Sequence, residues 1–175
     1  MNITRQTLLL WWGLTVTGAY LITEYIGHTM EHGHETVLWT WIVAMLIPVV
    51  MTLLLGSRQR NALVWVWALI TALATAQNYW AHAAGSKPVM QFSFHTLWFL
   101  FGAAGFAYTA AVVDGANRKW LYAGAAVLNL VGAAFLLLNP KSFEGYQYVI
   151  LALIQGVPIL LDVPLRRQHE AQTNS

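Results

Sequence analysis

The chain contains no cysteine among its 175 residues, and only 9% of its residues are charged. Without cysteine the protein cannot form disulfides, iron–sulfur clusters or thiolate metal sites. A soluble domain usually carries about a quarter charged residues, so the shortage of charge indicates a protein that folds in lipid. The nine lysines and arginines are scattered, and they do not form the basic stripe that a nucleic-acid surface requires. We therefore expect a lipid bilayer as a partner and no nucleic acid.

The sequence has six long apolar segments instead. Each is about 19 to 24 residues long, enough for a helix to cross a ~30 Å hydrocarbon layer. The segments cover residues 7–27, 37–55, 61–84, 92–113, 120–138 and 146–165. This pattern predicts an all-α fold, a polytopic integral membrane bundle of six transmembrane helices. Residues 1–165 would form the single transmembrane domain, and residues 166–175 a flexible cytoplasmic tail.

The basic residues predict the orientation of these helices. Six spans place Lys87 and Lys141 on one side of the membrane and the other seven lysines and arginines on the side of the N-terminus. Cytoplasmic loops carry the excess of lysine and arginine, so both termini are expected inside. A bacterial inner membrane protein is the expected location, with the Lys87 side facing the periplasm.

Polar side chains gather on that predicted periplasmic side. Five of the six histidines and three glutamates fall there: His28, His32, His34, His82, His95, Glu24, Glu31 and Glu35. The composition alone does not require this distribution. For His28, His32 and His34, which lie in or beside the first outer loop, a solvated surface and a metal site are equally good explanations.

Helical spacing narrows the candidate site to five residues. Glu24 and His28 are four residues apart, as are Asn78 and His82, so each pair shares one helical face. His95 begins the next helix after His82 ends the previous one. Two imidazoles with an amide or carboxylate oxygen suit a borderline transition metal. Polar anchoring at the membrane surface is the simpler alternative.

A stretch around this site resembles a known family. Asn78, Trp80, Ala81 and His82, followed after twelve residues by His95 and an aromatic-rich helix, resemble the metal site in the third membrane subunit of the copper membrane monooxygenases. The resemblance covers about 30 residues and lacks the second copy of that family's motif. It implies Asn78, His82 and His95 as copper ligands, and it assigns no role to Glu24 or His28.

Several functions follow from these observations. The first is a metalloprotein with copper favoured and zinc or iron open; if it is an enzyme, it is a metal-dependent membrane oxidoreductase acting on a small or lipid-soluble substrate. The second is a haem b electron carrier with two of His28, His82 and His95 as axial ligands. A cation or small-solute transporter and an accessory subunit are the others. Partner membrane subunits and a homo-oligomer both stay open.

Other sequence features predict packing. Small residues at Gly102–Gly105 and Gly132–Ala134 are expected to let the fourth and fifth helices approach closely. Asp114 with Arg118, and Asp162 with Arg166, are spaced to form ion pairs within one helix. Pro158 is expected to disturb the last helix.

Overall fold

The computed structural model describes residues 5–31, 33–59 and 62–173, and within these ranges it contains helices and no strand. The predicted all-α fold is confirmed. The elements are α1 (Arg5–Thr29), α2 (His34–Gln59), α3 (Ala62–Ala84), α4 (Lys87–Gln91), η1 (Phe92–Thr96), α5 (Leu97–Val112), α6 (Ala116–Leu138), α7 (Gln147–Leu151), η2 (Ala152–Gly156) and α8 (Val157–Thr173). α8 therefore includes most of the segment for which the sequence predicts a flexible tail.

Two of the long helices are interrupted by a π-helical turn. α4, η1 and α5 continue one another over Lys87–Val112, and α7, η2 and α8 do the same over residues 147–173. In both helices the π turn follows an opening α-helical segment of five residues. Pro158 lies just after η2 and has no N–H to offer the preceding turn, which is a physical reason for the irregular turn there. These continuous helices, with α1, α2, α3 and α6, give the six helices that the sequence predicts.

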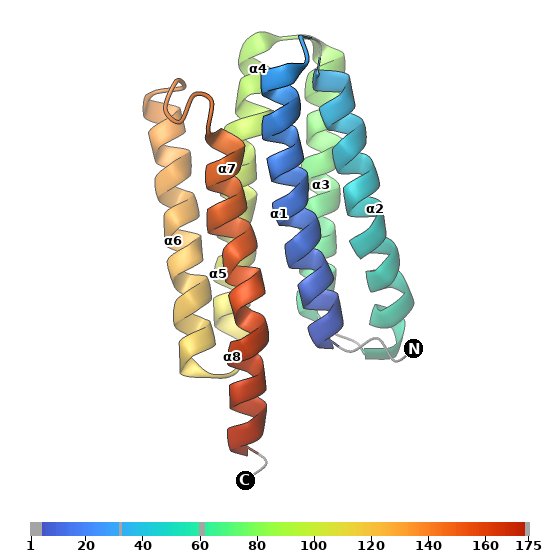
Figure 1. The fold of residues 1–175 in the computed structure, drawn as a ribbon, viewed down its shortest axis with the longest axis vertical. Helices are drawn as coiled ribbons and strands as arrows, with labels where there is room; N and C mark the ends of the chain where they lie inside the picture. Colours follow the sequence, from blue (N-terminus) through green and yellow to red (C-terminus); the bar gives the residue numbers. More distant parts are fainter. Residues whose placement is uncertain (1–4, 32, 60–61, 174–175) are drawn as a thin grey trace.

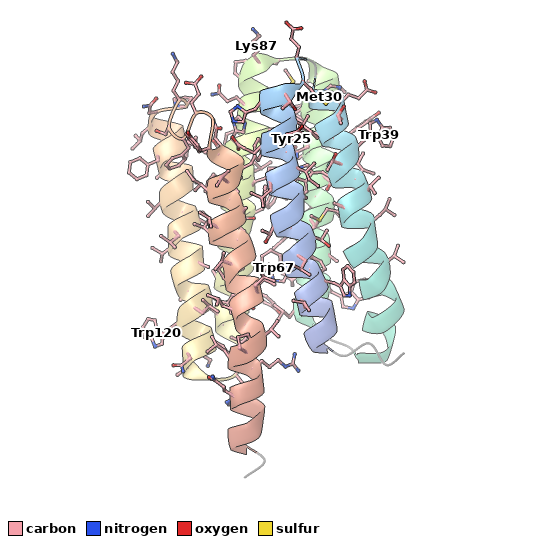
Figure 2. The ribbon with its side chains drawn as sticks, viewed as in Figure 1. Tyr25, Met30, Trp39, Trp67, Lys87 and Trp120 are labelled. Atoms are coloured by element: carbon pink, nitrogen blue, oxygen red, sulfur yellow. The ribbon has the colours of Figure 1, made fainter. Side chains whose placement is uncertain are left out.

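The six helices form a closed ring. α1 contacts α2, α2 contacts α3, α3 contacts α5, α5 contacts α6, α6 contacts α8, and α8 with η2 returns to α1. Figure 1 shows that the start of α1 and the end of α8 lie at the same end of the bundle, whereas α4 lies at the opposite end. We call the latter the Lys87 end, because Lys87 and Met30 mark it in Figure 2.

Within the described residues, three helices are long and apolar enough to cross a membrane: Lys87–Val112, Ala116–Leu138 and Gln147–Arg166. Large apolar side chains face outward on these and on the remaining helices. Trp39 and Trp120 are 57% and 78% exposed and lie toward opposite ends of the bundle (Figure 2). Aromatic side chains at both ends are typical of a bundle that lies across a bilayer.

The centre of the ring is held together by a buried network that we call the Gln155 network. The side-chain oxygen of Gln155 accepts a hydrogen bond from Tyr20 Oη at 2.8 Å. Its amide nitrogen donates to the Trp98 carbonyl at 3.0 Å and to Asn129 Oδ1 at 2.7 Å. The network thus joins α1, α5, α6 and η2. Because Gln155 and Asn129 are buried, each would be costly to leave without partners in an apolar bundle.

Small residues of α5 and α6 make room for the side chains that pack between these helices. Gly102 of α5 lies directly against the amides of Gln155 and Asn129, and Gly132 of α6 lies against the ring of Phe99. A larger side chain at either position would collide with these groups. The prediction that small residues let α5 and α6 pack closely is therefore confirmed.

An ion pair at the other end of the bundle differs from the sequence prediction. Arg118 pairs with Asp162 across α6 and α8, with Nε–Oδ1 and Nη2–Oδ2 distances of 2.5 and 2.9 Å. Toward Asp114, Arg118 donates only to the backbone carbonyl. The predicted Asp114–Arg118 side-chain pair is wrong, because the Arg118 guanidinium instead forms two hydrogen bonds with the buried Asp162 carboxylate, a stronger arrangement than a single contact.

We predict that Gly102→Ala destabilises the protein by about 1–3 kcal/mol and lowers its Tm by about 3–10 °C, since the new methyl group displaces the Gln155 network. Gly124→Ala is the matched control, because a Cβ at Gly124 meets open space and alanine favours a helix by up to about 1 kcal/mol. Thermal unfolding of the detergent-solubilised protein, followed by circular dichroism, measures both. Equal Tm values for the two variants would contradict the prediction.

Candidate functional site

Glu24 and His28 hold α1 to the segment between α6 and α7. The Nε2 atom of His28 lies 3.0 Å from Glu24 Oε1 and 3.0 Å from the Gly145 carbonyl oxygen, so its N–H is shared between two acceptors. The second oxygen of Glu24 accepts a hydrogen bond from the Tyr148 backbone N–H at 2.9 Å. Gly145 has a φ of 82°, a left-handed conformation that glycine adopts readily. We call Glu24, His28, Gly145 and Tyr148 the outer clasp.

Burial differs sharply between the two side chains of this pair. The Glu24 side chain is 11% exposed, whereas the His28 side chain is 59% exposed. The carboxylate is therefore held inside the bundle, and its hydrogen-bond partners offset the free energy that its burial costs. His28 lies beyond the predicted first span and faces solvent.

Asn78 ties α3 to the π turn η1. With its amide oriented to satisfy both neighbours, Asn78 donates to the Ser93 carbonyl at 3.0 Å and accepts from Trp98 Nε1 at 2.8 Å. Asn78 is 2% exposed, and Ser93 is fully buried. The contact sets the height of α3 relative to η1, the turn that also carries His95.

His82 lies one helical turn beyond Asn78 on α3. Its Nδ1 atom is buried and has no hydrogen-bond partner among the residues that the structure describes. His95, two residues after Ser93, packs its ring edge against Tyr148, with ring centroids 5.5 Å apart. His82 therefore follows Asn78 in α3, and His95 follows Ser93 in η1. Because Asn78 contacts Ser93, both histidines belong to the same end of this pair of helices.

Tyr148 connects the outer clasp to the aromatic interior. Its ring stacks on Tyr20 with centroids 6.4 Å apart, and Tyr20 contacts Trp41 at 4.7 Å. Trp41 in turn packs against Trp98 at 4.8 Å. A row of packed aromatic rings therefore runs from the outer clasp to the Gln155 network.

The five predicted site residues thus fall into two groups. Glu24 and His28 belong to the outer clasp, and Asn78, His82 and His95 lie at the contact between α3 and η1. Within residues 5–31, 33–59 and 62–173, no three His, Asp or Glu side chains are arranged to hold a metal ion. His32 of the predicted loop trio lies outside the described residues, and the side chain of His34 is not described.

Sequence reasoning did not identify Gly145 and Tyr148 as partners of the clasp. Both lie more than a hundred residues from Glu24 along the chain. They contribute a backbone carbonyl and a backbone N–H, which no side-chain pattern reveals.

Comparison of the chain with protein-family models, with curated proteins and with solved structures finds no match. The resemblance to the copper membrane monooxygenases stays a prediction from the residues named above.

We predict that the outer clasp weakens as the pH rises. The hydrogen bond to the Gly145 carbonyl, followed by that to Glu24, raises the pKa of His28 above its usual 6.5. The contribution of the protonated ring is therefore fully present below pH 6.5 and is lost as the pH rises through the higher folded-state pKa. Between about pH 6 and pH 9, the Tm of the native protein should therefore decrease more than the Tm of the His28→Gln variant does. The glutamine amide donates a hydrogen bond without titrating.

The control for this comparison is His169→Gln, which changes a histidine at the opposite end of the chain. It should retain the pH dependence of the native protein. Parallel curves for the native protein and His28→Gln would show that the clasp does not respond to the charge of His28.

Proposed function

We propose that the protein crosses a bacterial inner membrane six times, with both termini in the cytoplasm and the Lys87 end in the periplasm. Three helices with the length and composition of spans support the proposal. The seven-to-two distribution of basic residues and the exposed tryptophans toward both ends support it as well. The start of α1 and the end of α8 lie at one end, as an even number of crossings requires (Figure 1).

The absence of cysteine allows a direct test of this topology. Lys87→Cys should react with a membrane-impermeant maleimide in intact cells, because the residue is exposed at the periplasmic end. Lys119→Cys, in the turn before Trp120, should react only after the membrane is permeabilised. The reverse labelling pattern would invert the orientation, and labelling of both in intact cells would contradict the six-span topology.

We further propose that the periplasmic end binds a transition-metal ion through His82 and His95, with copper favoured and zinc or iron as alternatives. The buried Nδ1 atom of His82, which has no hydrogen-bond partner in the described structure, carries this proposal. A buried polar atom without a partner costs free energy, and a metal ion would supply one. Imidazole nitrogen is a preferred ligand of copper, zinc and iron.

The surrounding residues fit a role in holding these imidazoles. Asn78 fixes α3 against η1 through its contacts with Ser93 and Trp98, so it determines the separation of His82 and His95. Its amide oxygen has a second lone pair that is available to an ion. The Tyr148 ring packs against the His95 ring and restrains it. A bound copper ion would supply Lewis acidity or one-electron chemistry, and the chain would hold its ligands away from bulk water.

Glu24 and His28 have a different arrangement. Both are engaged in the outer clasp, which leaves His82 and His95 as the imidazoles on which the proposal depends. A role of Glu24 and His28 as metal ligands stays a prediction from the sequence.

The purified protein, loaded with copper and freed of excess ion, should retain about one copper per chain. His82→Ala and His95→Ala should each lower this to less than about one fifth, because one imidazole alone holds the ion weakly. His169→Ala is the control, since it removes a histidine at the cytoplasmic end. Copper content by mass spectrometry and folding by circular dichroism are measured on the same samples.

Two results would contradict the proposal. The first is a native protein that retains no copper, zinc or iron. The second is a metal content that is unchanged in the folded His82→Ala variant.

A further inference from the structure

The ring of helices surrounds a cavity that lies against the row of aromatic rings formed by Tyr20, Trp41 and Trp98. Its volume is about 20 Å³, room for a molecule of about one to three non-hydrogen atoms. Half of the residues in its wall are aromatic, including Tyr20, Trp41, Trp67 and Trp98, and Gln155 and Thr71 supply polar side chains. α1, α2, α3, α5, η2 and α8 all contribute to this wall, so the cavity lies on the axis of the ring.

Three of the four tryptophans that line the cavity already donate their indole N–H to the protein. The indole N–H of Trp41 donates to Thr23 at 2.9 Å, and that of Trp67 donates to Thr109 at 2.9 Å. Trp98 donates to Asn78 at 2.8 Å. These three rings therefore offer the cavity apolar surface and no further N–H.

Gln155 and Tyr20 keep acceptor capacity. Both N–H groups of the Gln155 amide donate within the Gln155 network, and its oxygen accepts a single hydrogen bond, from Tyr20. The Tyr20 hydroxyl uses its hydrogen in that bond and keeps its lone pairs. Tyr20 and Gln155 are therefore complementary to a ligand that donates a hydrogen bond, and the Thr71 hydroxyl and Trp12 indole, which also line the cavity, suit a ligand that can accept one as well.

The π turn η2 is a separate observation that points to the same place. It carries Gln155 as its fourth residue, and η1 carries His95 as its fourth residue. π turns are rare in helices and occur frequently at functional sites, because they turn a side chain out of the regular helical position. The bundle thus uses the same device for the proposed metal ligand His95 and for the polar residue of the cavity.

We propose that this cavity binds a small uncharged molecule with a short apolar body and one hydrogen-bond donor, the class of the short-chain primary alcohols. Among the described residues no Lys, Arg, Asp or Glu lines the cavity, so an ion would lack a counter-charge there. The apolar walls favour the hydrocarbon body, and Tyr20 and Gln155 accept the hydroxyl hydrogen. The site is separate from His82 and His95 and requires no bound metal.

The test uses ethanol as the probe and the full-length protein labelled with 5-fluorotryptophan. Fluorine resonances of Trp41 and Trp98, assigned with single Trp→Phe variants, should shift saturably with a Kd of about 1 mM or weaker, the limit for so small a ligand. Resonances of the exposed Trp39 and Trp120 should not saturate with them, which separates binding from a general solvent effect.

Variants locate the site. Ile70→Phe fills the cavity from α3 and should abolish the saturable shift, whereas Leu69→Phe on the exposed face of α3 should preserve it. Tyr20→Phe removes one acceptor and should weaken ethanol binding about threefold to tenfold. Circular dichroism shows whether each variant is folded, and the ethanol titration itself is made on the protein without substitutions.

Three outcomes would overturn the proposal. One is a shift of all four tryptophan resonances in parallel without saturation. Another is unchanged binding in the folded Ile70→Phe variant. The third is an equal saturable shift with ethylammonium chloride, which would show that the cavity does not exclude charge.

Discussion

Inside a hydrocarbon layer, a polar side chain must find its hydrogen-bond partner within the protein, because no water is present to supply one. In the proposed membrane-spanning topology, this constraint explains the arrangement of the helices better than any single apolar contact does. Lipid chains are as apolar as leucine, so apolar side chains alone give the helices little reason to associate in one particular order. The buried amides of Gln155, Asn129 and Asn78 are satisfied only when specific helices are neighbours.

The satisfied groups divide the bundle into layers. The Gln155 network fixes α1, α5, α6 and η2 around the cavity, and the Arg118–Asp162 pair fixes α6 to α8 at the cytoplasmic end of the proposed topology. At the Lys87 end the outer clasp fixes α1, and Asn78 fixes α3 to η1. In contrast to these groups, the buried Nδ1 atom of His82 has no hydrogen-bond partner among the described residues, a property it shares with the Thr17 hydroxyl.

Much of the fold could be predicted from the sequence, because chain composition and helix length follow from local rules. The six helices, the lack of strands in the described residues and the close packing at Gly102 and Gly132 are of this kind. The faces shared by Glu24 with His28 and by Asn78 with His82 also follow from helical spacing. The glutamate and histidine indeed lie 3.0 Å apart.

The partners across helices could not be predicted, because they depend on the rotation and height of each helix. Nothing local indicates that Asn78 would use the Ser93 carbonyl and the Trp98 indole, or that Arg118 would select Asp162 over Asp114. The π turns have the same origin. They depend on tertiary contacts as well as on Pro158, and they place His95 and Gln155 where a regular helix would not.

The central functional claim is that the imidazoles of His82 and His95 meet at one metal ion. X-ray absorption at the copper edge of the copper-loaded protein tests it most directly, because imidazole rings give a characteristic outer-shell scattering pattern. The account predicts about two imidazole nitrogens at about 2.0 Å from the metal, a usual distance for a metal–histidine bond. A spectrum with only oxygen neighbours and no imidazole scattering would contradict it.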